Sequence, residues 1–267
     1  MLGSTFANFQ VLEKIGQGGT ADIYVVNDQT GQRYALRVLR AEHRYNWRRI
    51  WRFRRECVLL ELFDHPNIVH GFGHGKFRGQ RYSIREYVEG GNLKDRILRS
   101  DPQVQVHRLK LLTGMAAGLA HIHEHGYMHL DFKPENVLVT AAYEPKIVDF
   151  ELCTRRPDRP KRIGKMPGTP AYLAPEQIAR QPIDERVDIF AYGVTAYEML
   201  TGKKPVTGNT VQEVLQKYAR FDEHLKPLRT HVPTIPPNIE RVVLKCLEKD
   251  PDRRYPAMSL VVRDLQS

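Results

Sequence analysis

One stretch decides how this chain is interpreted: His129-Leu130-Asp131-Phe132-Lys133-Pro134-Glu135-Asn136-Val137-Leu138-Val139. Within it, Asp131, Lys133 and Asn136 place a carboxylate, an ammonium and an amide close together, and a second carboxylate follows at Asp149. A carboxylate can accept a hydroxyl proton, an ammonium can steady negative charge, and an Asn with an Asp can hold a divalent cation. Phosphoryl transfer needs these groups, because positioning and charge stabilisation supply most of its rate.

The length and composition are those of a globular protein. The 267 residues suffice for one large domain or two packed lobes, and contents of 41% hydrophobic and 27% charged residues are ordinary. No apolar run approaches the roughly 18 residues of a transmembrane helix, and residues 1–6 do not begin a signal peptide. The three cysteines are widely spaced and odd in number, which indicates a reducing compartment. We therefore expect a cytoplasmic chain without a membrane segment.

The net charge of +10 is concentrated in two stretches. Residues 40–55 hold seven Arg and one acidic residue, and residues 155–165 hold six Arg or Lys and one acidic residue. Such stretches favour acidic partners, among them a phosphorylated protein, nucleic acid or an anionic membrane. A merely solvated surface explains them equally well. Basic runs alone are weak evidence for nucleic acid, so no DNA partner is expected.

Strand patterns dominate the first hundred residues and helical patterns dominate the rest, which predicts an α+β protein of two lobes. Two short strands, 9–15 and 22–27, flank a Gly-rich turn at residues 16–21, so that backbone N–H groups of a hairpin could approach phosphate. Most such glycine clusters are simple turns. The next strand, 33–39, places Ala35 and Arg37 on one face, although an ordinary surface Arg would give the same pattern.

A helix is predicted over about residues 46–63. Its apolar residues recur every three or four positions and should form the buried stripe, namely Trp47, Ile50, Phe53, Cys57 and Leu60. Glu56 lies beside this stripe, and the helical arginines should face mostly outward.

Two later helices carry features of their own. The predicted helix 109–125 holds histidines at positions 121, 123 and 125, a spacing that could suggest a metal site. The Cys and carboxylate ligands that usually complete such a site are missing. The helix 184–200 has Asp184 as a candidate cap and Gly202 just beyond its end. Strands at 136–139 and 146–148 and final helices at 238–247 and 258–265 complete the prediction.

Together the motifs resemble those of protein kinases, over about residues 9–265. Residues 129–136 resemble the catalytic-loop motif HRDLKPEN, with Leu130 in place of the Arg, and residues 174–176 resemble the APE motif. The pattern is most similar to bacterial-type Ser/Thr kinases. The resemblance implies a bilobal α+β fold, with a β-rich N-lobe at residues 1–86 and an α-rich C-lobe at residues 87–267.

The resemblance also implies roles for individual residues. Asp131 would be the catalytic base and Lys133 would steady the transferring phosphoryl group, while Asn136 and Asp149 would hold Mg²⁺ or Mn²⁺. ATP would bind in the interlobe cleft, and a protein hydroxyl would be the acceptor. The residues implied to contact the nucleotide are Ile15, Gly16, Gly18, Gly19, Ala21, Ile23, Ala35, Arg37, Glu56, Arg85, Glu86, Val88 and Leu138.

Further pairings follow from the same resemblance. Glu56 should pair with Arg37, Arg254 should pair with Glu176, and Asp188 should tie back to the catalytic loop. Among the hydroxyls between residues 151 and 174, Thr154 would be the one candidate regulatory phosphosite, since Thr169 and Tyr172 stand at structural positions.

Four departures from the family pattern fall at or near the nucleotide site. Arg37 replaces a Lys, Arg85 stands at the usually apolar or small gatekeeper position, Glu151 replaces a Gly, and Leu130 replaces an Arg. They favour a signalling or scaffolding pseudokinase that binds nucleotide with impaired or absent phosphotransfer. The alternative is an active atypical Ser/Thr kinase, because Asp131 and the other catalytic groups are all present. We also expect Glu56 or Glu151 to contact Arg85, giving a self-satisfied polar cluster.

Overall fold

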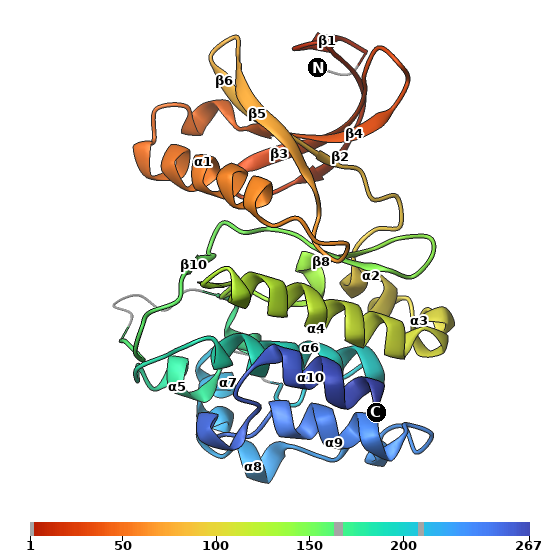
Figure 1. Cartoon of the computed structure of the whole chain (residues 1–267), viewed down its shortest axis with the longest axis vertical. Helices are drawn as coiled ribbons and strands as arrows, with labels where there is room; N and C mark the ends of the chain where they lie inside the picture. The colour runs from red at the N-terminus through yellow and green to blue at the C-terminus, as the bar shows by residue number, and fades with distance from the viewer. Residues whose placement is uncertain (1–2, 163–167, 208–210) are drawn as a thin grey trace. The chain divides into compact units, whose positions relative to one another are not determined.

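The computed structural model describes residues 3–162, 168–207 and 211–267 (Figure 1). It divides into two compact units. The first comprises residues 1–89 together with Asp149–Glu151, and the second comprises Gly90–Val148 and Leu152–Ser267. The boundary expected after Glu86 thus lies slightly before the observed division, and the segment around Asp149 belongs to the first unit. Part of the basic stretch 155–165 lies outside the described residues.

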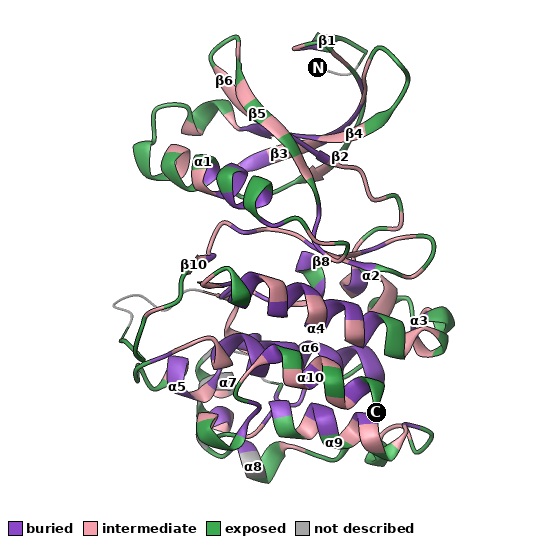
Figure 2. Cartoon of the chain, in the orientation of Figure 1, coloured by how far each residue is buried: buried purple, intermediate pink, exposed green. Residues whose placement is uncertain are grey.

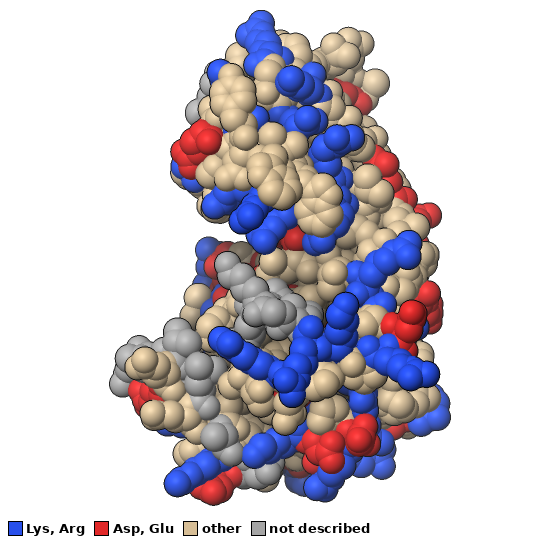
Figure 3. All heavy atoms as spheres, turned by 90° about the vertical axis from the view of Figure 1, so that its left-hand side faces the viewer, with Lys and Arg blue, Asp and Glu red and all other residues tan. Residues whose placement is uncertain are grey.

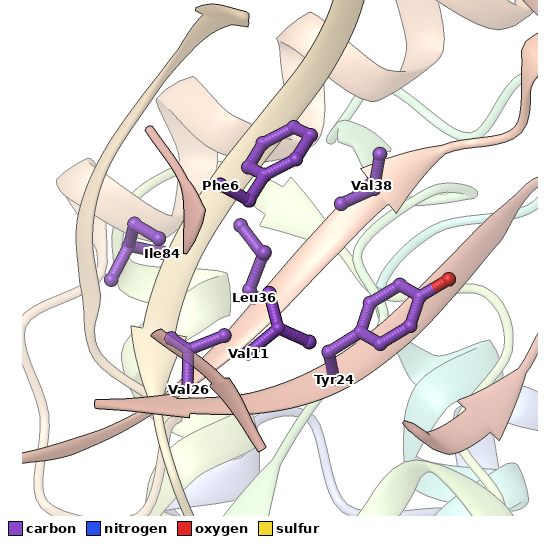
Figure 4. Close-up of a cluster of buried hydrophobic side chains, with 7 residues drawn as sticks. All are labelled: Phe6, Val11, Tyr24, Val26, Leu36, Val38 and Ile84. Atoms are coloured by element: carbon purple, nitrogen blue, oxygen red, sulfur yellow. The ribbon is translucent and has the colours of Figure 1, made fainter. Parts of the chain in front are cut away.

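The first unit is built on one antiparallel six-stranded sheet with the order β1-β2-β3-β4-β6-β5. Its strands are β1 Thr5–Phe6, β2 Phe9–Gln17, β3 Ala21–Asn27, β4 Arg33–Leu39, β5 Gly71–Phe77 and β6 Gln80–Glu86. Strand alternation brings one set of apolar side chains to a common face (Figure 4): Phe6, Val11, Tyr24, Val26, Leu36, Val38 and Ile84. This cluster is the core of the sheet.

The helix α1, Trp47–Leu62, packs on the sheet through a second cluster. Asn46 caps it by accepting a hydrogen bond from the Arg49 backbone N–H at 3.2 Å. The predicted stripe is confirmed at Phe53 and Cys57, which join Ala21 and Leu39. It is wrong at Trp47, which is 70% exposed. Each step of three residues turns the helix about 60° short of a full rotation. The two steps that lead from Phe53 back to Trp47 therefore add up to about 120°, which carries Trp47 off the buried face.

The second unit is mainly helical. Its helices are α2 Leu93–Leu98, α3 Pro102–Val106, α4 Arg108–Glu124, α5 Pro175–Ile178, α6 Arg186–Thr201, α7 Val211–Ala219, α8 Phe221–His224, α9 Pro237–Cys246 and α10 Met258–Gln266. Two small antiparallel ladders accompany them: β7 Tyr127–Met128 with β10 Thr154–Arg155, and β8 Val137–Val139 with β9 Pro145–Ile147. Short 3-10 turns occupy Ala41–His43 in the first unit and Pro134–Asn136, Pro170–Tyr172, Leu228–Thr230 and Pro251–Arg253 in the second.

The helix α6 forms the centre of this unit, and nearly all its residues are buried (Figure 2). Gly202 ends it in the left-handed conformation at φ 69°, as the sequence predicts. The predicted start is two residues too early. Asp184 precedes the cap position, although its carboxylate still accepts the Arg186 backbone N–H at 3.0 Å.

A buried ion pair joins α5 to the turn before α10. The Nη1 and Nη2 atoms of Arg254 donate to the two Glu176 carboxylate oxygens, at 2.6 and 2.7 Å, as predicted. The Arg254 side chain is fully buried and also donates to the carbonyl oxygens of Glu248 and Lys249. The planar fork of a guanidinium matches these acceptors, whereas an ammonium would not.

We therefore expect Arg254→Lys to lower the free energy of unfolding by about 1–3 kcal/mol, although the charge is kept. Urea denaturation would measure the change. The matched control is Arg253→Lys, because the neighbouring Arg253 side chain is 70% exposed. Equal effects of the two substitutions would contradict a special role for the buried fork.

Candidate active site

The catalytic-loop residues of the second unit form one hydrogen-bonded group. The Lys133 ammonium donates to Asp131 Oδ2 at 2.8 Å and to Thr169 Oγ1 at 2.7 Å. Thr169 in turn donates to Asp131 Oδ1 at 2.9 Å. The amide nitrogen of Asn136 donates to the Asp131 backbone oxygen at 2.8 Å, so Asn136 Oδ1 is the atom left to ligate a cation. The Asp131–Thr169 contact was not predicted, since Thr169 lies far along the chain.

A close backbone approach brings Thr169 to this loop. Gly168 has a φ of 107°, and a Cβ there would lie 2.7 Å from the Leu130 carbonyl oxygen. Only a glycine fits this position without displacing the backbone. Tyr172 is buried close by, while Thr154, the candidate phosphosite, lies in β10.

The loop is held from below by Asp188 of α6. Its carboxylate accepts the backbone N–H groups of His129 at 2.7 Å and Leu130 at 2.9 Å, together with His123 Nε2 at 2.8 Å. Burial would raise the pKa of Asp188, but the His123 contact and the backbone donors lower it below its ordinary value. Leu130 adopts a left-handed φ of 65°, a strained backbone that these hydrogen bonds stabilise.

The three histidines at the end of α4 and just beyond it have different contacts. His123 serves Asp188, and the rings of His121 and His125 lie 4.3 Å apart. Within the described part of the chain, no group of three or more His, Cys, Asp or Glu residues is arranged to hold a metal ion.

In the first unit, Arg37 of β4 points into a buried charged cluster. It is 9% exposed and forms the predicted ion pair with Glu56 of α1. Its Nη2 also lies 3.3 Å from Thr20 Oγ1 and 3.7 Å from Glu151 Oε2. Burial alone would lower the pKa of Arg37, but Glu56, Asp149 and Glu151 outweigh it and raise the pKa.

The protein kinase domain family matches residues 9–265 of this chain. The chain belongs to the protein kinase family. It is 31% identical to "Probable serine/threonine-protein kinase PknB" of Lactococcus lactis, over 99% of this chain and 42% of that protein. It is 30% identical to serine/threonine-protein kinase PrkC of Bacillus subtilis, over 97% of this chain and 40% of that protein. The chain therefore spans about two fifths of the length of these bacterial relatives.

Membership of the family accounts for the fold. The sheet-rich and helical units are the N-lobe and C-lobe of the α+β protein kinase fold. None of the helices within residues 3–162, 168–207 and 211–267 has the length and apolar character needed to cross a bilayer.

The residues matching the nucleotide-site motifs fall in both lobes. The N-lobe carries the β2–β3 hairpin with Ile15, Gly16, Gly18, Gly19, Ala21 and Ile23, the β4 residues Ala35 and Arg37, Glu56, and the segment with Arg85, Glu86 and Val88. The C-lobe carries Leu138 on β8. Gly16 pairs with Ile23, and Ala35 pairs with Arg85, so sheet register fixes the hairpin and places Arg85 beside Ala35.

A further, milder departure from the kinase pattern, beyond the four named above, is explained by packing. Ala21 stands where the Gly-rich loop usually has its third glycine, and it is 1% exposed. Its methyl group packs with Leu39, Phe53 and Cys57 under α1. The extra carbon is therefore absorbed by the core.

Arg85, at the gatekeeper position, completes the charged cluster. Its Nη1 donates to Glu56 Oε1 at 2.9 Å and its Nε donates to Ser83 Oγ at 3.0 Å. The expected Glu56–Arg85 contact is therefore present. Burial would raise the pKa of Glu56, but Arg37 and Arg85 lower it to about 2.

Glu151 ties the segment Asp149–Glu151 to the rest of the N-lobe. Its carboxylate accepts from Thr20 at 3.3 Å and lies 3.8 Å from Arg52, and its carbonyl accepts from Arg55 at 2.9 Å. The sequence offered one signal for these contacts, the acidic residue in place of a glycine, but it did not identify Thr20, Arg52 or Arg55 as partners. Asp149 beside it has a left-handed φ of 64°, and carboxylate and amide oxygens such as those of Asp149 and Asn136 suit Mg²⁺.

We expect Glu56→Gln to destabilise the N-lobe by about 3–5 kcal/mol, because it leaves the buried Arg85 without a counter-charge and Arg37 with only the more distant Glu151. Urea denaturation followed by N-lobe fluorescence would measure the change. Glu61→Gln on the same helix is the control, since the Glu61 side chain is 46% exposed and should matter little.

The pH dependence gives a second readout of the same substitution. The folded pKa of Glu56, about 2, lies below the ordinary value of 4.5, so its contribution to stability is fully present above pH 4.5 and is lost as the pH falls toward 2. Wild type should therefore lose stability more steeply than Glu56→Gln over this window. Parallel pH profiles would contradict the charged state assigned to Glu56.

Proposed function

We propose that this kinase domain binds ATP with Mg²⁺ or Mn²⁺ and has impaired or absent phosphotransfer, acting in signalling or as a scaffold. The observation that carries the proposal is the charged cluster around Arg37. Its guanidinium is engaged by Glu56 and faced by Glu151, and Arg85 takes the other oxygen of Glu56.

This cluster changes the group that would meet nucleotide phosphates. A guanidinium is bulkier than the ammonium of a Lys and needs different geometry. To reach phosphate, Arg37 would also have to give up part of its contact with Glu151. The loss of one preorganised electrostatic contact typically costs about 10²–10³ in rate, and effects within one site are not additive.

An active atypical Ser/Thr kinase is the second candidate, and the C-lobe favours it. Asp131 is held by Lys133 and Thr169 in a connected group, and Asn136 is oriented toward the same loop. In that case Asp131 would accept the proton of a protein hydroxyl and Lys133 would steady the transferring phosphoryl group. Under either candidate, Asn136 and Asp149 would hold the metal ion.

The partner and the location are part of the proposal. A protein substrate or partner is implied by the family, and the basic N-lobe favours one that is acidic or phosphorylated. Cys57, Cys153 and Cys246 are buried free thiols, which supports a reducing, cytoplasmic location.

Thermal unfolding with ATP or ADP, with and without Mg²⁺ or Mn²⁺, tests nucleotide binding. A ligand that binds only the folded state raises the melting temperature by mass action, so we expect a rise. Radiolabelled phosphotransfer should then match the background of Asp131→Asn. Transfer well above that background would establish the active alternative, and no thermal shift at millimolar nucleotide would contradict nucleotide binding.

Substitution of Glu151 tests the cause of the impairment. We expect Glu151→Gly to bind ATP about tenfold more tightly, because Arg37 would lose the carboxylate that competes with phosphate. Glu151→Gln removes the negative charge but does not restore the backbone freedom of a glycine. It therefore separates the effect of the charge on ATP affinity from the effect of the backbone. Tighter ATP binding in Glu151→Gly alone would assign the effect to the backbone. Unchanged ATP affinity in both variants would contradict the proposed competition between the Glu151 carboxylate and phosphate.

A further inference from the structure

Several cationic side chains lie together in the N-lobe, where β4 ends beside the β5–β6 hairpin. A cavity of about 270 Å³ opens there, and it is lined by Leu39, Arg44, Tyr45, Lys76, Gly79 and Arg81. Three of these six residues are cations and none is acidic. The residues implied in nucleotide binding do not line this cavity.

The sheet itself forces two of the cations together. Lys76 of β5 and Arg81 of β6 are direct cross-strand partners. Like charges directly opposite one another destabilise a β-ladder. Across the described residues, neither cation forms an ion pair with an acidic side chain within 4.0 Å, so their repulsion is not relieved by the chain. An anion in the cavity would relieve it.

The third cation is held in place by its neighbour. Arg44 Nη2 donates to the Tyr45 hydroxyl at 2.6 Å, and the Arg44 guanidinium lies 4.6 Å from the centre of the Tyr45 ring. Leu39 is 2% exposed and contributes apolar surface to the cavity wall. The cavity therefore combines three cationic groups with an aromatic and an apolar wall.

Several other basic residues of this lobe already have partners. Figure 3 shows Lys and Arg side chains gathered over the N-lobe with few acidic ones among them. Of the arginines on α1, Arg52 and Arg55 contact Glu151, and Arg48 lies over the Trp47 ring. By contrast, none of the three cations that line the cavity has an acidic side chain within 4.0 Å among the described residues.

We propose that this cavity binds the phosphate group of a phosphorylated Ser or Thr in a partner protein. A compact dianion fits three convergent cations, with the Arg forks bonding phosphate oxygens in pairs and Lys76 acting as a point charge. The ring of Tyr45, which is 82% exposed and lines the cavity, offers apolar surface to a residue flanking the phosphate. This inference rests on the proposed phosphorylated partner and names its docking site, and it does not depend on phosphotransfer.

The test uses a fluorescein-labelled peptide, Gly-Phe-phosphothreonine-Tyr-Gly, and its unphosphorylated form. Fluorescence anisotropy at low salt should detect binding of the phosphopeptide alone. Inorganic phosphate should compete with it weakly, since it lacks the flanking side chains. Tighter binding of a single-stranded oligonucleotide, or of vesicles containing phosphatidylserine, would overturn the assignment to a phosphoprotein.

Variants of one hairpin locate the site. Arg81→Gln or Lys76→Gln should raise the dissociation constant of the phosphopeptide about tenfold, the effect of losing one charge-assisted contact. Arg78→Gln is the matched control, because Arg78 lies in the same hairpin but does not line the cavity. Equal effects of all three substitutions would mean that the phosphopeptide is bound by overall positive charge and not by the cavity, which would overturn the proposal.

Two further readouts separate this site from the nucleotide site and from misfolding. Arg81→Gln should unfold at the same or a higher temperature than wild type, since it removes a like-charge pair. Its thermal shift with ATP should be unchanged. If phosphopeptide binding persists in Arg81→Gln, the cavity is not the docking site, although a phosphorylated partner remains supported. If the wild type does not bind the phosphopeptide, both the docking site and the phosphorylated partner are contradicted.

Discussion

The N-lobe depends on the buried carboxylate of Glu56. It is fully inaccessible to solvent, and its two oxygens meet Arg37 of β4 and Arg85 of β6. An unpaired charge at such depth would cost several kcal/mol, so α1 can pack on the sheet only where both guanidinium groups reach it. This one carboxylate therefore ties the helix α1 to the strands β4 and β6. Glu151 extends the same cluster to the segment that carries Asp149.

The C-lobe solves a similar problem with Asp188. A buried carboxylate accepts two successive backbone N–H groups and so holds Leu130 in a left-handed conformation that it would otherwise avoid. Asp131 follows directly and gains its fixed position from this loop. In both lobes, a buried acidic side chain whose charge is satisfied positions residues to which the kinase pattern assigns the chemistry.

Much of this arrangement could be predicted from the sequence, because local patterns and family spacing determine it. The bounds of β4, the Glu56–Arg37 and Glu176–Arg254 pairs and the glycine at the end of α6 all follow from such patterns. Contacts between distant segments could not be predicted this way. Thr169 meets Asp131 only because Gly168 permits a close backbone approach, and no local period encodes that approach.

The departures from the kinase pattern also make better sense together than singly. A Lys with Glu56 would be a neutral pair, and Arg37 preserves that balance. Arg85 adds one buried positive charge, and Glu151 adds one negative charge on the other side of Arg37. Among these four side chains the two additions balance, with two positive charges facing two negative ones. Both carboxylate oxygens of Glu56 are paired without nucleotide, whereas Arg85 Nη2 is buried with no hydrogen-bond partner among the described residues. Under the function proposed above, a phosphate that enters would compete with the carboxylates already facing Arg37.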